Sequence, residues 1–294
     1  MKTLKLFLAA ITFFAAITLL GTAQAQINLL EPPQVADTNP LLRTTGPNTV
    51  GKGRLQLSGD ASFYDFRQNL EMFDGTIHHY NARVSGGGLG LRIGLGSRVE
   101  LLAGFSGSYE RYHYEFDLTS TTDTVIDNAY PRLAPSLGLK LMLYEGGNGW
   151  VPQVSASLVY SHHLVKYSDS DWDTPGGGNF AALGFQFRNH LGSRWVLDYG
   201  FSYAFGKDRT LGYNIPYASQ SDNPFQFNIM ARCLATDKLM VSFGMENVGG
   251  AAEVLWQATP NLQLKAQGGL AAGLGPSHGM LETNALVGFN WMLR

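Results

Sequence analysis

Long runs in which apolar and polar residues alternate at every second position constrain this chain more than any other feature. From Leu89 to Leu95, leucine and isoleucine alternate with glycine and Arg92, and the alternation resumes from Val99 to Phe105. A period of two places successive side chains on opposite faces and indicates a β-strand. The sequence therefore predicts an all-β fold in which one face of each strand is apolar and the other is small and polar.

About twelve segments follow this pattern, and their spacing predicts how they are connected. The expected strands cover residues 53–66, 77–95, 98–118, 130–145, 150–166, 179–191, 194–206, 223–235, 238–248, 252–259, 261–274 and 280–293. Short turns alternate with long polar stretches, which are residues 67–76, 119–129, 167–178 and 207–222. Outer-membrane barrels have short periplasmic turns and long extracellular loops. We therefore expect an antiparallel transmembrane β-barrel of about 12 strands.

The apolar faces of these strands are expected to contact lipid. Twelve strands that closed in water with these faces outward would expose far more apolar surface than soluble monomers tolerate. A two-sheet sandwich that buries the same faces is the alternative. The segments commonly run to 11 residues or more, which matches a tilted membrane strand better than the ~5–6 residues of a globular sheet.

The chain begins with an expected export signal. Lys2 and Lys5 precede an apolar run over residues 6–20, and residues 23–25 have the small-x-small pattern of a signal-peptidase site. The apolar run is too short for a helix across the ~30 Å hydrocarbon core of a bilayer. We therefore assign residues 1–25 to a signal peptide and expect the mature protein in the outer membrane of a Gram-negative-type cell.

Residues 26–50 differ from the barrel that is expected over 51–294. Four prolines keep this segment out of a helix or a central strand. Two readings stay open: a disordered periplasmic leader, or an insert that occludes the barrel from the periplasmic end.

Composition excludes several classes of protein. The net charge is −2 and charged residues make up 15% of the chain, below the roughly 25% that is usual in soluble domains. We therefore expect no nucleic-acid partner. The single cysteine cannot form a disulfide within the chain, so a disulfide scaffold is excluded.

The polar faces predict which charged residues line the lumen. Two changes in the phase of the alternation, at Gly86–Gly88 and at Tyr109–Tyr112, predict a β-bulge in each strand. With those bulges, bases and acids of nearly equal number face inward, which gives no strong field of one sign. The lumen-lining candidates are Arg83, Arg92, Glu100, Arg132, Lys140, Arg188, Asp198, Arg232, Glu246, Glu253, Lys265 and Glu282, with Glu110 beside them. They line a passage or pair across it and close it.

Two histidine pairs, His78-His79 and His162-His163, invite a metal site. Neighbours on a strand point to opposite faces, so neither pair can chelate an ion by itself. We expect no metal and no cofactor.

Three aspartates in a long polar stretch, Asp169, Asp171 and Asp173, have the spacing that opens a Ca²⁺ loop. The glycine and glutamate that complete such a loop are replaced by Thr174 and Phe180, so the helix-loop-helix site fails. A loose divalent-ion site stays open as an alternative to a solvated loop.

Four segments resemble a known family when they are taken together. They are Thr49–Leu57, Leu91–Leu101, Leu137–Lys140 and Ala258–Leu264. They resemble the family of outer-membrane transporters named for the MetA pathway of phenol degradation, and the resemblance covers most of residues 38–294. It implies an exported barrel that passes small, often hydrophobic, molecules, and no catalytic residues come with the resemblance.

The expected function is the passive passage of small, in particular hydrophobic or aromatic, solutes through an outer-membrane channel that contacts outer-membrane lipid. The main alternative is a structural or adhesive barrel that binds through its long loops. A lesser alternative is a lipid-modifying enzyme, because Ser161 and His163 lie two residues apart on one strand face. The pattern places both inward, away from lipid, so we expect no enzyme.

Overall fold

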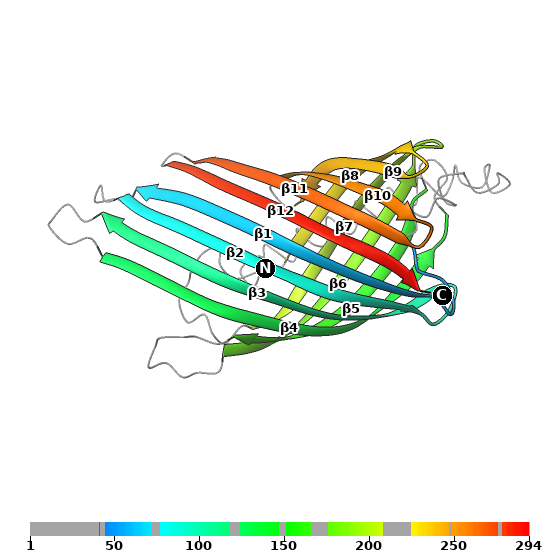
Figure 1. The fold of residues 1–294 in the computed structure, drawn as a ribbon, viewed down its shortest axis with the longest axis horizontal. Coiled ribbons are helices and arrows are strands. Elements are labelled where there is room, and N and C mark those ends of the chain that lie inside the picture. The colour runs from blue at the N-terminus through cyan, green and yellow to red at the C-terminus, as the bar shows by residue number, and fades with distance from the viewer. Residues whose placement is uncertain are drawn as a thin grey trace, which may run out of the picture.

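The strands of the chain close into a barrel (Figure 1). The computed structural model describes residues 41, 45–71, 77–117, 124–146, 151–165, 176–207, 225–246, 249–275 and 278–293. The strands are β1 (Leu55–Glu71), β2 (Ile77–Gly94), β3 (Val99–Asp117), β4 (Thr124–Tyr144), β5 (Gln153–Val165), β6 (Gly176–His190), β7 (Trp195–Lys207), β8 (Phe225–Thr236), β9 (Leu239–Glu246), β10 (Gly249–Thr259), β11 (Leu262–Gly275) and β12 (His278–Leu293).

Every strand pairs antiparallel with its neighbours in the chain, and β1 pairs with β12 to close the ring. This seam runs from the pair Leu55 and Leu293 to the pair Gln68 and Met280. A closed ring leaves no strand edge with unpaired backbone groups, which is the condition for a sheet to span a bilayer. The predicted antiparallel barrel of about 12 strands is confirmed.

The strands are longer than predicted at the end away from the short turns. β1 continues to Glu71, β4 begins at Thr124 and β6 begins at Gly176, all inside stretches that were expected to be loops. The rest of those stretches, including Asp169, Asp171 and Asp173, lies outside the described residues.

The two predicted bulges are wrong. β2 keeps one register against β1 from Ile93 to Ile77 and one register against β3 from Gly94 to Ile77. Shifts of register occur instead near the short turns, at Met142–Tyr144 in β4 for example. The inward and outward faces of β1, β2 and β3 therefore do not exchange along their length.

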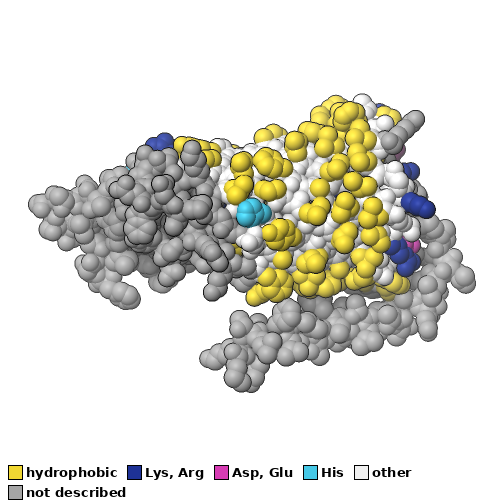
Figure 2. Space-filling view, turned by 90° about the horizontal axis from the view of Figure 1, so that it is seen from below, with side chains coloured by type: hydrophobic (Ala, Val, Ile, Leu, Met, Phe, Trp, Pro, Cys, Tyr) yellow, Lys and Arg dark blue, Asp and Glu magenta, His cyan; other side chains and the backbone are white. Residues whose placement is uncertain are grey.

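The outer surface of the barrel is apolar. Leu89, Leu137 and Val287 are 57%, 56% and 60% exposed, and Figure 2 shows hydrophobic side chains covering the middle of the visible face, with positive charges at its two ends. Such a surface suits the hydrocarbon of a bilayer better than water. Among the described residues there is no helix with the length and apolarity to cross a membrane.

The connections from each even-numbered strand to the next strand, all of eight residues or fewer, lie at one end of the barrel together with the C-terminus (Figure 1). They include the turns at 95–98, 191–194 and 237–238. Residues 45–54 join β1 at this same end, because Gly53 and Arg54 exchange backbone hydrogen bonds with Gly94 at the end of β2. We call it the short-turn end.

Candidate functional site

One wall of the lumen carries a chain of charged side chains near the short-turn end. The Arg188 guanidinium donates from Nε to Asp198 Oδ1 and from Nη2 to Asp198 Oδ2, both at 2.6 Å. Arg232 donates from Nε to Asp198 Oδ2 at 2.7 Å. Two guanidinium groups therefore share one carboxylate, and this carboxylate and Arg188 are buried inside the barrel.

The chain of charges continues across β8, β9 and β10 to β11. Arg232 Nη1 donates to Glu253 Oε1 and, at 3.1 Å, to Ser242 Oγ. Glu253 also pairs with Lys265, whose Nζ lies 3.5 Å from Oε2. Six neighbouring strands, β6 to β11, are thereby linked from inside.

A second group of charges lies on the opposite side of the ring, on β2 and β3. Arg92 Nη2 and Glu100 Oε1 are 2.8 Å apart. Arg92 Nη1 also donates to Gln56 Oε1 on β1, at 3.2 Å. Glu100 is fully buried, so its charge depends on these partners and not on water.

The segment before β1 enters the lumen and bonds to both groups of charges. Lys140 Nζ donates to the backbone oxygens of Gly46 and Asn48, at 2.8 and 3.1 Å. Arg92 Nη2 donates to the same Asn48 oxygen at 2.8 Å. On the far side, Arg188 Nη2 donates to Thr45 Oγ1 at 2.9 Å. Two backbone oxygens and one hydroxyl oxygen, all neutral, thus accept hydrogen bonds from three lumen cations.

This segment also satisfies a lumen acid. The backbone N–H of Val50 donates to Glu100 Oε2 at 2.9 Å, and Val50 itself is buried. Residues 45–50 therefore offer acceptors to the bases and a donor to the acid. We call residues 45–50 the inner segment.

An apolar cluster holds the chain just before the inner segment. Leu41, which is fully buried, belongs to one cluster with Val196, Leu234, Met240 and Leu255. The last four come from β7, β8, β9 and β10 on the lumen side, where a polar face was expected. Their burial gives the chain an apolar anchor beside the polar one.

Gly46 permits the close approach of the inner segment to the wall. Its φ is 65°, in the left-handed region that glycine adopts without strain. A Cβ at this position would lie 2.6 Å from Arg188 Nη2 and 3.0 Å from Asp198 Oδ2. Both the turn and the space beside the ion pair therefore require glycine.

Basic side chains outnumber acidic side chains around the inner segment. Among the described residues the bases are Arg92, Lys140, Arg188, Arg232 and Lys265, and the acids are Glu100, Asp198 and Glu253. Backbone oxygens of the inner segment accept hydrogen bonds from two of these bases. The nearly neutral lumen that the sequence predicted is therefore locally basic at the short-turn end.

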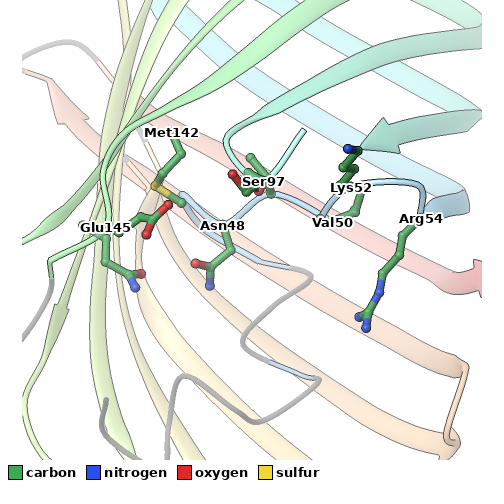
Figure 3. Close-up of a pocket in the computed structure, with 10 residues that line it drawn as sticks. Asn48, Val50, Lys52, Arg54, Ser97, Met142 and Glu145 are labelled. Atoms are coloured by element: carbon green, nitrogen blue, oxygen red, sulfur yellow. The ribbon is translucent and has the colours of Figure 1, made fainter. Parts of the chain in front are cut away.

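A cavity of about 450 Å³ opens between the inner segment and the wall at this end. Figure 3 shows Met142 and Glu145, at the end of β4, facing Asn48, with Lys52 and Arg54 farther along the chain. Acidic and basic side chains both line this cavity, which lies next to the short turns.

Among the described side chains, the lumen away from the short-turn end is polar with fewer charges. Arg132 and Glu110 pair there, with Nε and Oε1 3.1 Å apart. A second cavity, of about 230 Å³, is bordered by β5, β6, β7 and β8 and includes hydroxyl and amide side chains. Those side chains are Ser157, Gln186, Ser202, Gln226 and Asn228.

Arg83 was predicted to line the lumen, and this prediction is wrong. Its Nε lies 3.4 Å from Asp65 Oδ1. Arg83 is six residues from the outward Leu89 on β2, and Asp65 is two residues from the outward Phe63 on β1. The bulge that would have turned Arg83 inward does not exist. The side chains of Glu246 and Glu282 lie outside the described part of the structure.

The two histidines of β5 face opposite sides, as neighbours on a strand must. His162 Nδ1 lies 2.8 Å from Asn179 Oδ1, and Tyr160 on the same outer face donates to that oxygen at 2.6 Å. His163 Nε2 lies 3.2 Å from Ser161 Oγ on the lumen side. That distance suits a nucleophile and its base, but the pair faces away from lipid. Among the described residues no three His, Cys, Asp or Glu side chains are grouped to hold a metal ion.

Some residues of the site were not among the predicted ones. Gln56, Ser242 and the inner segment bond to the predicted charges. The apolar cluster around Leu41 lies nearer to the short turns than these charges. Gln56 and Ser242 could have been found from their inward strand positions. The contacts of the inner segment carried no signal, because Lys140 and Gly46 are 94 residues apart in the chain.

Together the fold and the lumen define a closed antiparallel β-barrel of the outer-membrane type. No protein-family model and no curated protein matches the sequence. The family resemblance of the four sequence segments therefore stays a prediction.

Several solved structures are similar to the chain. An outer-membrane channel from Pseudomonas putida F1 is 14% identical, with 83% of this chain and 97% of that chain covered and a TM-score of 0.48. The transport unit of the autotransporter AIDA-I from Escherichia coli is 10% identical over 89% and 99%, with a TM-score of 0.48. The toluene transporter TbuX from Ralstonia pickettii is 9% identical over 90% and 96%, with a TM-score of 0.46. At these identities and TM-scores none of them assigns a function to this chain.

Proposed function

We propose that the protein is an outer-membrane channel for the passive passage of small solutes, and that residues 26–50 act as a plug at its periplasmic end. The short-turn end is the periplasmic end in this proposal, because outer-membrane barrels turn tightly on that side. The observation that carries the proposal is the position of the inner segment inside the barrel. The inner segment is held by hydrogen bonds to lumen side chains and is not a strand of the wall.

Barrel size supports this function. Barrels of about 8 strands are filled by side chains, and those of about 16–18 leave an aqueous channel. A ring of twelve strands lies between these limits, so a narrow path is available once the inner segment has moved.

Small, often hydrophobic, solutes are the proposed cargo. The resemblance of the four sequence segments to a family of transporters for such molecules supports this part of the proposal. The toluene transporter among the similar structures carries no weight at 9% identity. Transport down a gradient needs neither a nucleotide nor a catalytic group.

Solute flux into liposomes tests the proposal. The mature chain is reconstituted, and the entry of neutral aromatics, sugars and salts is compared with entry into empty liposomes. We expect slow flux through the wild type and faster flux through variants whose inner segment is weakened. A folded, inserted barrel that passes none of these solutes, with or without a weakened inner segment, would contradict the channel function.

A further inference from the structure

Three arginines form a basic patch on the outer face of the barrel at the end away from the short turns. They are Arg67 on β1, Arg83 on β2 and Arg111 on β3, which we call the arginine patch. In the register of the sheet Arg83 lies directly opposite Asp65 on one side and directly opposite Arg111 on the other. The three residues Asp65, Arg83 and Arg111 thus form one row across three strands.

The arginine patch faces outward. Phe63 on β1, Leu89 on β2 and Phe105 on β3 are all exposed on the outer surface. Arg67, Arg83 and Arg111 lie at even spacings from them, and the register is unbroken between. Side chains at even spacing on a strand share a face.

The height of the arginine patch places it at the edge of the apolar surface. Twelve residues separate Arg83 from Leu95 at the short-turn end. At ~3.3 Å per residue and a tilt of ~40°, they span ~30 Å along the barrel axis. The apolar band of an outer-membrane barrel is ~25 Å tall. The arginines therefore lie just beyond the hydrocarbon, at the level of lipid headgroups.

The arginine patch has an excess of positive charge. Asp65 pairs with Arg67, at 2.8 Å, and with Arg83, at 3.4 Å. Among the described residues no carboxylate pairs with Arg111. The nearest other acid on this face of β3, Glu115, lies 3.8 Å from His113. The arginine patch therefore holds three guanidinium groups and one carboxylate, which pairs with two of them.

Two like charges directly opposite each other on antiparallel strands destabilise a sheet. An anion between Arg83 and Arg111 would remove this cost, and a phosphate group accepts paired bonds from guanidinium groups with good geometry. At this height on an outer-membrane barrel, the available anions are the phosphates of the outer-leaflet glycolipid. We propose that the arginine patch binds a phosphate of that glycolipid. The inference rests on the proposed outer-membrane position.

The test measures lipid bound to the full mature protein. Wild type and the double variant Arg83→Gln/Arg111→Gln are reconstituted in zwitterionic vesicles that contain either diphosphorylated lipid A or its dephosphorylated form. Lipid retained by the protein is then counted by native mass spectrometry. The control variant Arg54→Gln/Arg98→Gln removes two exposed arginines at the short-turn end.

We expect wild type and the control variant to retain diphosphorylated lipid A, and the double variant to retain it at least about tenfold less, since each lost charge-assisted bond is worth about a factor of ten or more. Equal retention of diphosphorylated lipid A by the double and control variants would overturn the inference. Equal retention of the two forms of lipid A by the wild type would also overturn it, because it would indicate recognition of sugar or acyl chains. Flotation with the vesicles and solute flux separate the two proposals. A barrel that floats, passes solutes and ignores the phosphate contradicts only the arginine patch, and one that binds the lipid without flux contradicts only the channel.

Discussion

Arg188 and Asp198 lie directly opposite each other on β6 and β7 and join through two parallel hydrogen bonds of 2.6 Å. Arg188 is fully buried, although it lines the lumen of a barrel. Arg232 on the next strand and Thr45 of the inner segment bond to the same pair. The pair therefore links the wall to the inner segment.

Replacement of Arg188 by methionine should destabilise the barrel strongly. Breaking a buried ion pair from one side leaves the other charge without its main partner, which costs ~3–5 kcal/mol. The free energy of unfolding in urea, measured in lipid vesicles, should fall by that amount. Arg98→Met removes an exposed pair with Glu145 and should change it by less than ~1 kcal/mol. Equal effects of the two variants would contradict the weight given to the buried pair.

Lys140→Met should open the channel without unfolding it. Lys140 holds the inner segment through the oxygens of Gly46 and Asn48, and methionine fills similar space without donating. We expect a higher ratio of open to closed time in single-channel recordings, by about thirtyfold if each of the two lost bonds contributes ~1 kcal/mol. Lys238→Met, at the exposed turn between β8 and β9, is the control. Unchanged recordings for Lys140→Met would mean that other contacts hold the segment.

Gly46→Ala should also release the inner segment, because the new methyl group meets Arg188 and Asp198 and the backbone is left-handed. Gly53→Ala is the matched control, since Gly53 has a φ of 72° but nothing within 4 Å of its Cβ position. In both variants the left-handed backbone costs ~1 kcal/mol. Only in Gly46→Ala does the new methyl group also clash with neighbouring side chains. Faster liposome flux is therefore expected for Gly46→Ala alone. Similar flux for both would assign the effect to backbone strain.

Leu137→Arg should impair insertion of the barrel into vesicles. Leu137 is exposed on the outer face of β4, and an arginine near the middle of the bilayer costs ~2–4 kcal/mol. Ser106→Arg places the same side chain on the lumen side of β3 and is the control. The fraction of folded protein, read from heat-modifiable migration on gels, should fall for Leu137→Arg and stay near wild type for Ser106→Arg. The reverse order would contradict the assignment of the faces.

The wall of the barrel was predictable because alternation is a local property of each strand. Leu89 and Arg92 already show which side is apolar and which is polar. Their neighbours across the sheet were not needed for that conclusion, and the number of strands followed from counting such segments.

Arg83 was assigned to the wrong face for a physical reason. Along β2 the outward residues change from Leu89 to Arg83, because the surroundings of the strand change where the apolar surface ends. A change of surroundings and a β-bulge produce the same change of pattern in one strand. Only the pairing of Arg83 with Asp65 and Arg111 on its neighbours distinguishes them.

The contacts of the inner segment could not be predicted, since they depend on backbone atoms. Asn48 and Gly46 accept hydrogen bonds through their backbone oxygens. Every residue has such an oxygen, so the side chains of these two residues do not indicate a partner. The excess of bases near Lys140 and Arg188 was hidden as well, because the sequence gives the number of lumen charges but not their height.

Residues 51–54 join the inner segment directly to β1. Its binding to the lumen is therefore intramolecular, and a tether this short corresponds to a local concentration on the millimolar scale or above. A peptide with the sequence of residues 41–50, added from outside, would have to reach such concentrations to compete. In the proposed plug, opening is consequently a first-order event whose rate does not depend on the amount of protein in the membrane.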